Sequence, residues 1–80
     1  MRLPRDFSGA DLAKRLERLG YQVTRRTGSH MRLTFADLPE HHLTIPNHES
    51  LRVGTLAAIL QAVAARHGIS RDELTARLFA

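Results

Sequence analysis

The sequence predicts one small α+β domain, in which a helix, three antiparallel strands and a second helix follow one another, with a short helical extension at the end. Apolar residues recur at helical spacing near both ends of the chain, and the middle alternates with the two-residue period of strands. A chain of 80 residues suffices for one hydrophobic core but not for two. Both long helices are therefore expected on the single apolar face of the sheet, and the other face stays open.

The first helix is expected from about Gly9 to Leu19, because Ser8 is a suitable N-cap and Gly20 is a suitable stop. Leucines at positions 12, 16 and 19 form one apolar stripe along it. The opposite face is predicted to be basic, and its members are Lys14, Arg15 and Arg18.

A strand is expected from Tyr21 to Arg26, followed by a turn at residues 27–29. In the returning strand Met31, Leu33 and Phe35 project to the apolar face. The side chains predicted on its open face are His30, Arg32 and Thr34. If the first strand keeps one alternation throughout, it adds Gln22, Thr24 and Arg26 to the same face.

A turn at residues 36–40 leads to the third strand, which is expected from His41 to Ile45. His42 and Thr44 are predicted to point outward, beside His30, whereas His41 points inward or to an edge. The sheet is expected to be antiparallel. A polar, basic face that carries histidines is a plausible surface for nucleic acid.

The second long helix is expected to open at Gly54 and to close at Gly68, because apolar residues recur at helical spacing among many alanines. His67 is interpreted as a favourable positive charge at its C-terminus. Ser70 and Glu73 form a capping box for a short third helix. The sequence leaves open whether this extension packs on the core or on a partner.

Composition favours an acidic or polyanionic partner, because 12 basic residues stand against eight acidic ones and the isoelectric point is about 11.1. The chain has no cysteine, which suits a reducing compartment and removes thiolate metal sites. No apolar run has the length of a membrane span, and the N-terminal residues do not read as a signal peptide. A cytoplasmic protein that does not contact membranes is expected.

Four short motifs extend along nearly the whole chain: Gly20-Tyr21, the run Arg-Arg-Thr-Gly-Ser-His at residues 25–30, Pro46-Asn47-His48 and Gly54-Thr55-Leu56. Together they resemble the pattern of the HicA family, which comprises messenger-RNA interferase toxins of toxin-antitoxin systems. The resemblance implies a double-stranded-RNA-binding-domain-like fold and endoribonuclease activity without a cofactor. It also implies a HicB-like antitoxin as partner, through which alone DNA would be contacted. Met31 departs from the pattern, which often has another histidine or an aromatic residue there.

The resemblance assigns the catalytic histidine of the Gly-Ser-His motif to His30. Cleavage of RNA without a metal needs a base that takes the proton of the ribose 2′-hydroxyl, and histidine suits that task near neutral pH. The phosphate charge must also be balanced, and strict alternation makes Arg26 and Arg32 the nearest candidates. The residues expected to bind RNA are Arg25, Arg26, Ser29, Arg32 and Lys14.

Two further histidines are secondary candidates. His42 could act as the opposite proton carrier or could merely be a neighbour of His30. His48 matches a histidine of the family pattern, but a loop histidine also commonly bonds its own loop. A metal site is not expected, because the chain lacks cysteine, the His-Glu-x-x-His motif and paired carboxylates at ligand spacing.

Two other functions compete with the toxin interpretation. A non-catalytic RNA-binding module would use the same basic face, and replacing His30 would then weaken binding without removing a cleavage step. A protein-interaction subunit would use its charge to dock an acidic partner and would lack salt-sensitive affinity for RNA. DNA binding by a helix-turn-helix is disfavoured because three strands separate the helices.

Overall fold

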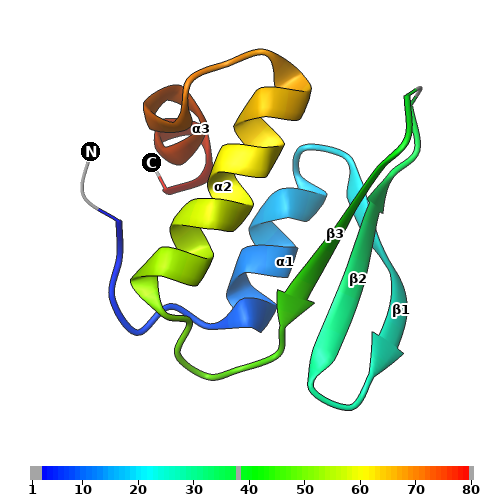
Figure 1. Cartoon of the computed structure of the whole chain (residues 1–80), viewed down its shortest axis with the longest axis vertical. Coiled ribbons are helices and arrows are strands. Elements are labelled where there is room, and N and C mark those ends of the chain that lie inside the picture. Colours follow the sequence, from blue (N-terminus) through cyan, green and yellow to red (C-terminus); the bar gives the residue numbers. More distant parts are fainter. Residues whose placement is uncertain (1–2, 38, 80) are drawn as a thin grey trace.

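The computed structural model describes residues 3–37 and 39–79 and shows a helical layer against one face of a three-stranded sheet (Figure 1). Its elements are α1 (Gly9–Glu17), β1 (Tyr21–Thr27), β2 (His30–Phe35), β3 (His41–Pro46), α2 (Val53–His67) and α3 (Arg71–Phe79). The strands are antiparallel in the order β1-β2-β3. This arrangement confirms the predicted α+β fold and agrees with a double-stranded-RNA-binding-domain-like architecture.

The predicted helix caps are present. The Ser8 side chain accepts a hydrogen bond from the Asp11 amide at 3.0 Å. Helix α1 ends at Glu17, two residues before the expected Leu19, because the chain tightens into a turn before Gly20. At the start of α3, the Glu73 amide donates to the Ser70 hydroxyl at 3.0 Å, and α2 ends at Gly68 in the left-handed conformation.

The core lies between the sheet and the helices, and α3 belongs to it. Leu74 and Leu78 of α3 are 0% and 1% exposed. They join the buried leucines of α1 and α2 and the apolar face of the strands. The C-terminal extension therefore packs on this chain's own core, which answers the question that the sequence left open.

Arg15 does not belong to a solvated basic face, contrary to the prediction. Its guanidinium group lies over the rings of Phe7 and Phe79, at 5.3 and 5.1 Å from their centroids. It also donates a 2.6 Å hydrogen bond to the Leu78 carbonyl. The long, amphipathic side chain of Arg15 thus holds α3 against α1. Lys14 and Arg18 are exposed, as predicted.

A β-bulge in β1 changes which arginine faces the open side of the sheet. Val23 is opposite Leu33, but the register then shifts, so that Arg25 is opposite Arg32 and Arg26 is opposite Met31. The prediction of one uninterrupted alternation is therefore wrong for Arg26. Because Thr24 is the extra residue, Arg25 takes the place on the open face that strict alternation predicts for Arg26.

Gly9 allows a close approach between α1 and the sheet. A Cβ atom there would lie 2.0 Å from the Pro46 carbonyl oxygen and 3.3 Å from Cγ2 of Ile45. The Gly9 amide also donates to the His48 carbonyl at 2.9 Å. The first turn of α1 is thus fixed against the end of β3, at the row that contains His30.

We expect Gly9→Ala to lower the free energy of unfolding by about 3 kcal/mol, because the obstacle is backbone and cannot rotate away. Urea denaturation of both proteins measures the difference. Gly54→Ala is the matched control, since an added Cβ there meets nothing within 4 Å and alanine favours a helix. Equal losses at the two glycines would contradict the predicted close packing.

Candidate nucleic-acid interface

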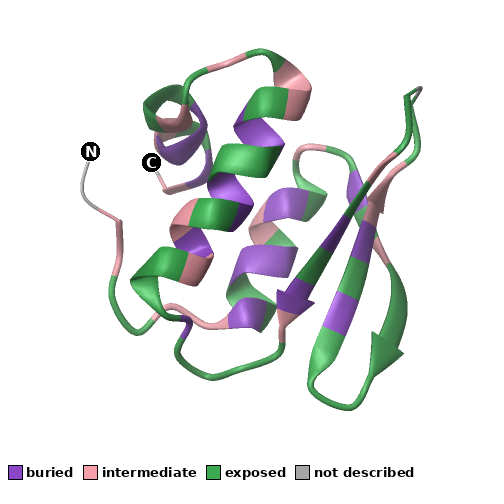
Figure 2. Cartoon of the chain, in the orientation of Figure 1, coloured by how far each residue is buried: buried purple, intermediate pink, exposed green. Residues whose placement is uncertain are grey.

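Exposed and buried residues alternate along the middle of β2 and β3 (Figure 2), and the exposed ones, His30, Arg32, His42 and Thr44, are polar. Strand pairing arranges the face on which they lie in rows: His30 lies between Thr27 and Pro46, and the next row places Arg32 between Arg25 and Thr44. A third row pairs Thr34 of β2 with His42 of β3. Histidine, arginine and threonine side chains from the three strands therefore share one surface, the open face of the sheet.

His30 lines a hollow of about 210 Å³ at the hairpin end of the open face. The other residues around it are Arg25, Thr27, Met31, Arg32 and Thr44. The sequence produces this hollow because the alternation of β2 sends His30 and Arg32 outward, and the bulge at Thr24 brings Arg25 opposite Arg32. The predicted catalytic histidine thus lines the same hollow as two arginines.

The His30 ring is oriented by the turn that precedes it. Its Nδ1 atom is 3.2 Å from the Ser29 hydroxyl. The Ser29 carbonyl accepts a 2.6 Å hydrogen bond from the Asn47 amide, which ties the hairpin to the end of β3. When Nδ1 donates to Ser29, Nε2 keeps its lone pair and can accept a proton from a substrate.

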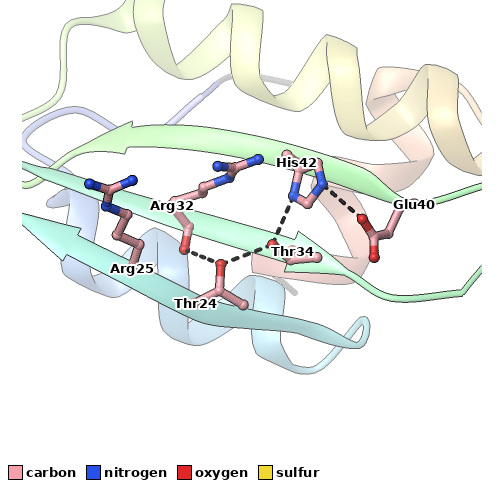
Figure 3. A pocket seen from close by; sticks show the side chains of 6 residues that line it. All are labelled: Thr24, Arg25, Arg32, Thr34, Glu40 and His42. Carbon is pink, nitrogen blue, oxygen red and sulfur yellow. Dashed lines mark hydrogen bonds and ion pairs between the residues drawn. The ribbon is translucent and has the colours of Figure 1, made fainter.

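A second, larger hollow of about 400 Å³ adjoins the first on the same face (Figure 3). Arg25 and Arg32 border both hollows. The remaining residues that line it are Thr24, Thr34, Glu40 and His42. Hydrogen bonds connect these side chains in a row: Thr24 to Thr34 at 2.9 Å, Thr34 to His42 at 2.9 Å and His42 to Glu40 at 3.0 Å.

The structure separates His42 from His30, although both lie on the open face as predicted. His42 pairs with Thr34, four residues along β2 from His30. At a rise of about 3.3 Å per residue the two rows are about 13 Å apart. One phosphate group does not span that distance, so this geometry does not favour His42 as the opposite proton carrier for a reaction at His30.

The other predicted RNA-binding residues do not all gather at His30. Lys14 is exposed on α1, in the helical layer behind the sheet. Arg26 is exposed but is paired with Met31, whose side chain faces the core. His48 is exposed in the loop after β3 and lines a separate hollow of about 280 Å³ with Arg52 and Thr55. The residues that meet at His30 are Arg25, Ser29 and Arg32.

Glu40 is the functional candidate that sequence reasoning missed. It was assigned to a turn, because Asp37 and Pro39 precede it. The available signal was its position two residues before His42, since side chains two apart in an extended chain lie on the same face.

Two histidines lie at the other side of the sheet and hold the end of α2 against it. The Tyr21 hydroxyl is 2.6 Å from Nδ1 of His41 and 3.3 Å from Nε2 of His67. Burial and the nearby Arg66 lower the pKa of both histidines, and burial raises the pKa of Tyr21 to about 12. The interpretation of His67 as a positive charge at a helix end is therefore wrong, because its surroundings favour the neutral ring.

This cluster is expected to make the fold less stable in mild acid. The unfolded histidines bind protons below a pH of about 6.5, whereas the folded chain resists their protonation. Stability should therefore fall as pH drops through 6.5 towards 5. Urea unfolding across that range measures it, and His41→Gln/His67→Gln should show a shallower fall. An unchanged pH dependence in this double variant would place the acid-sensitive groups elsewhere.

Neither a membrane span nor a ready metal centre is found in the part of the chain that the structure describes. None of the helices in residues 3–37 and 39–79 combines the length and the apolar character needed to cross a bilayer. Within the same residues, no three histidine, aspartate or glutamate side chains are grouped so that they could hold a metal ion.

Comparison with known proteins gives one match. Residues 9–64 match the family described as the HicA toxin of bacterial toxin-antitoxin, and this span contains the entire sheet and both hollows. No curated protein and no solved structure gives a significant match. Helix α3 lies outside the matched span. Since the match covers well over half of the chain, the protein belongs to the HicA family and is a toxin of a toxin-antitoxin system.

Proposed function

We propose that this toxin is an endoribonuclease that cuts messenger RNA at the hollow around His30 and that a HicB-like antitoxin neutralises it. The observation that carries the proposal is the position of His30 beside Arg25 and Arg32 on an exposed, polar surface. A general base and two phosphate-binding groups are thus available at one point. The net charge of +4 supports attraction of a polyanion to the chain.

The proposed reaction is attack by a ribose on its own phosphate. Nε2 of His30 accepts the proton of the 2′-hydroxyl, and the resulting oxygen bonds to the adjacent phosphorus. The bond from phosphorus to the 5′-oxygen then breaks, and that oxygen takes a proton from solvent. The products are a 2′,3′-cyclic phosphate and a 5′-hydroxyl end.

Charge accumulates on the phosphate oxygens during this step, and the two arginines are placed to balance it. Guanidinium groups present planar pairs of N–H donors that match phosphate oxygens. Since side chains supply both the base and the countercharge, attack by the 2′-hydroxyl requires no metal ion for either role. We therefore expect cleavage to proceed when metal ions are chelated.

The test is incubation of the purified chain with a defined messenger RNA in the presence of EDTA, with the products resolved on a gel. Fragments that end in a 2′,3′-cyclic phosphate are the expected result, and addition of a HicB-like antitoxin should suppress them. Intact RNA that is nevertheless bound by the folded chain would overturn the nuclease and favour a non-catalytic RNA-binding module. Intact RNA without salt-sensitive binding would favour a protein-interaction subunit.

A further inference from the structure

We propose that the larger hollow on the open face binds the base of the nucleotide next to the link held at His30, and that Glu40 makes it favour bases with an exocyclic amino group. The inference rests on the proposed RNA cleavage. It concerns which RNA is held, whereas the proposed function concerns how RNA is cut. Glu40 would be a specificity-determining residue.

The two hollows form one path for an RNA strand. Arg25 and Arg32 are register partners in β1 and β2, and both residues line both hollows. A phosphate held by this pair therefore joins a nucleotide at His30 to a nucleotide over the larger hollow. The distance of about 13 Å between the His30 and His42 rows gives room for a neighbouring nucleotide rather than for a second group on the same phosphate.

The charge on the open face changes sign along this path. Figure 3 shows the Arg25 guanidinium at one end of the larger hollow, the Glu40 carboxylate at the other and the Arg32 guanidinium between them. A phosphate is attracted to the arginine end and repelled from the carboxylate end. The carboxylate end therefore suits the uncharged part of a nucleotide, and a base edge that carries hydrogen-bond donors suits it best.

Hydrogen bonds fix the Glu40 carboxylate and leave one oxygen available. A carboxylate only accepts, so Nε2 of His42 donates to Oε1 of Glu40 across 3.0 Å. On its other side, Nδ1 of His42 bonds the Thr34 hydroxyl at 2.9 Å. Within residues 3–37 and 39–79, Oε2 receives no hydrogen bond, and the Glu40 side chain is 54% exposed.

Base chemistry then decides the preference. Cytosine, adenine and guanine present an amino group on the edge that pairs with another base, and a carboxylate accepts a hydrogen bond from such a group. Uracil carries a carbonyl oxygen where cytosine carries its amino group, and that oxygen is repelled by the carboxylate. Cytosine and uracil are equal in size and differ at two adjacent positions, because N3 accepts in cytosine and carries a hydrogen in uracil. That N3–H lies between two carbonyl oxygens that the carboxylate repels, so the amino group of cytosine is the better donor to Glu40.

The experiment measures fluorescence anisotropy of labelled oligocytidine and oligouridine of equal length with the full chain. It uses His30→Ala, so that the RNA stays intact. Oligocytidine is expected to bind about tenfold more tightly than oligouridine. Adding Glu40→Gln should bring the two affinities within about twofold, because the amide NH₂ donates to the uracil carbonyl. Adding Glu17→Gln instead, an exposed carboxylate on α1, should leave the preference unchanged.

Equal binding of the two RNAs, or a preference that survives Glu40→Gln, would overturn the subsite, and so would failure of oligocytidine to bind. These are binding results and are independent of cleavage. A chain that prefers oligocytidine but leaves messenger RNA intact would keep the subsite and overturn the nuclease. A chain that cuts RNA but binds both oligonucleotides equally would keep the nuclease and overturn the subsite. Glu40 is exposed, and circular dichroism confirms that each variant is folded.

Discussion

His30→Ala is expected to slow RNA cleavage by about 10²- to 10⁴-fold, which is the range that one general acid-base group contributes. The affinity for RNA should change by no more than about threefold, because Arg25 and Arg32 remain to hold the phosphates. Single-turnover cleavage at saturating protein measures the first quantity, and anisotropy with a 2′-deoxy substrate analogue measures the second. A loss of rate without a loss of affinity is the signature of proton transfer.

His30→Gln separates proton transfer from hydrogen bonding at the same position. Glutamine can still bond the Ser29 hydroxyl, which lies 3.2 Å from Nδ1 of His30, but it takes up no proton near neutral pH. It should therefore be as slow as the alanine variant, and the urea midpoint of both should match the parent because His30 is exposed. A glutamine variant that cuts at the parental rate would show that His30 only positions the RNA.

Much of the fold follows from local signals in the sequence. Helical spacing of leucines and good caps such as Ser8 and Ser70 act within one or two turns, so their effect is visible without knowledge of the rest of the chain. The alternation of β2 works in the same way, because apolar residues mark one face and His30, Arg32 and Thr34 mark the other. These elements were therefore predicted at nearly their observed bounds.

No local pattern in the sequence predicts the bulge in β1. After Val23 the strand continues with polar residues only, so no apolar side chain marks the face that turns inward. A register shift at Thr24 then costs no hydrophobic contact, and either Arg25 or Arg26 can face outward without changing the pattern. Pairing with β2 decides which of the two arginines faces outward, and the alternation within β1 alone does not predict that pairing.

Roles that depend on contacts between residues far apart in the sequence also could not be predicted from local patterns. Arg15 is held by Phe7 and Phe79, and the latter lies at the far end of the chain. Burial and the nearby Arg66 lower the pKa of His67, whose ring meets the Tyr21 hydroxyl across the core. The sequence nevertheless predicts the centre of the candidate site, since the family motif points to His30 and the alternation of β2 puts Arg32 on the same face. The neighbouring hollow with Glu40 emerged only when β2 and β3 were paired.

Arg25→Ala and Arg32→Ala are each expected to slow cleavage by about 10²-fold, because in the proposed reaction each removes a donor that balances the charge developing on the phosphate. Arg26→Ala should change the rate by less than about fivefold. It removes the same charge from the next position, but the bulge pairs Arg26 with Met31 and turns it away from the hollow. Single-turnover rates of the three variants, compared at one salt concentration, measure the difference.

The comparison of adjacent arginines separates local geometry from overall charge. Arg25 and Arg26 carry equal charge and are both exposed, so removing either lowers the long-range attraction for RNA to a similar extent. The two arginines differ only in the face of the sheet on which they lie. A large difference between the cleavage rates of the two variants therefore requires the register shift at Thr24. If Arg26→Ala were the slow variant and Arg25→Ala the fast one, β1 would alternate without a bulge in solution. Equal, modest losses would instead mean that the arginines attract RNA but do not touch the reacting phosphate.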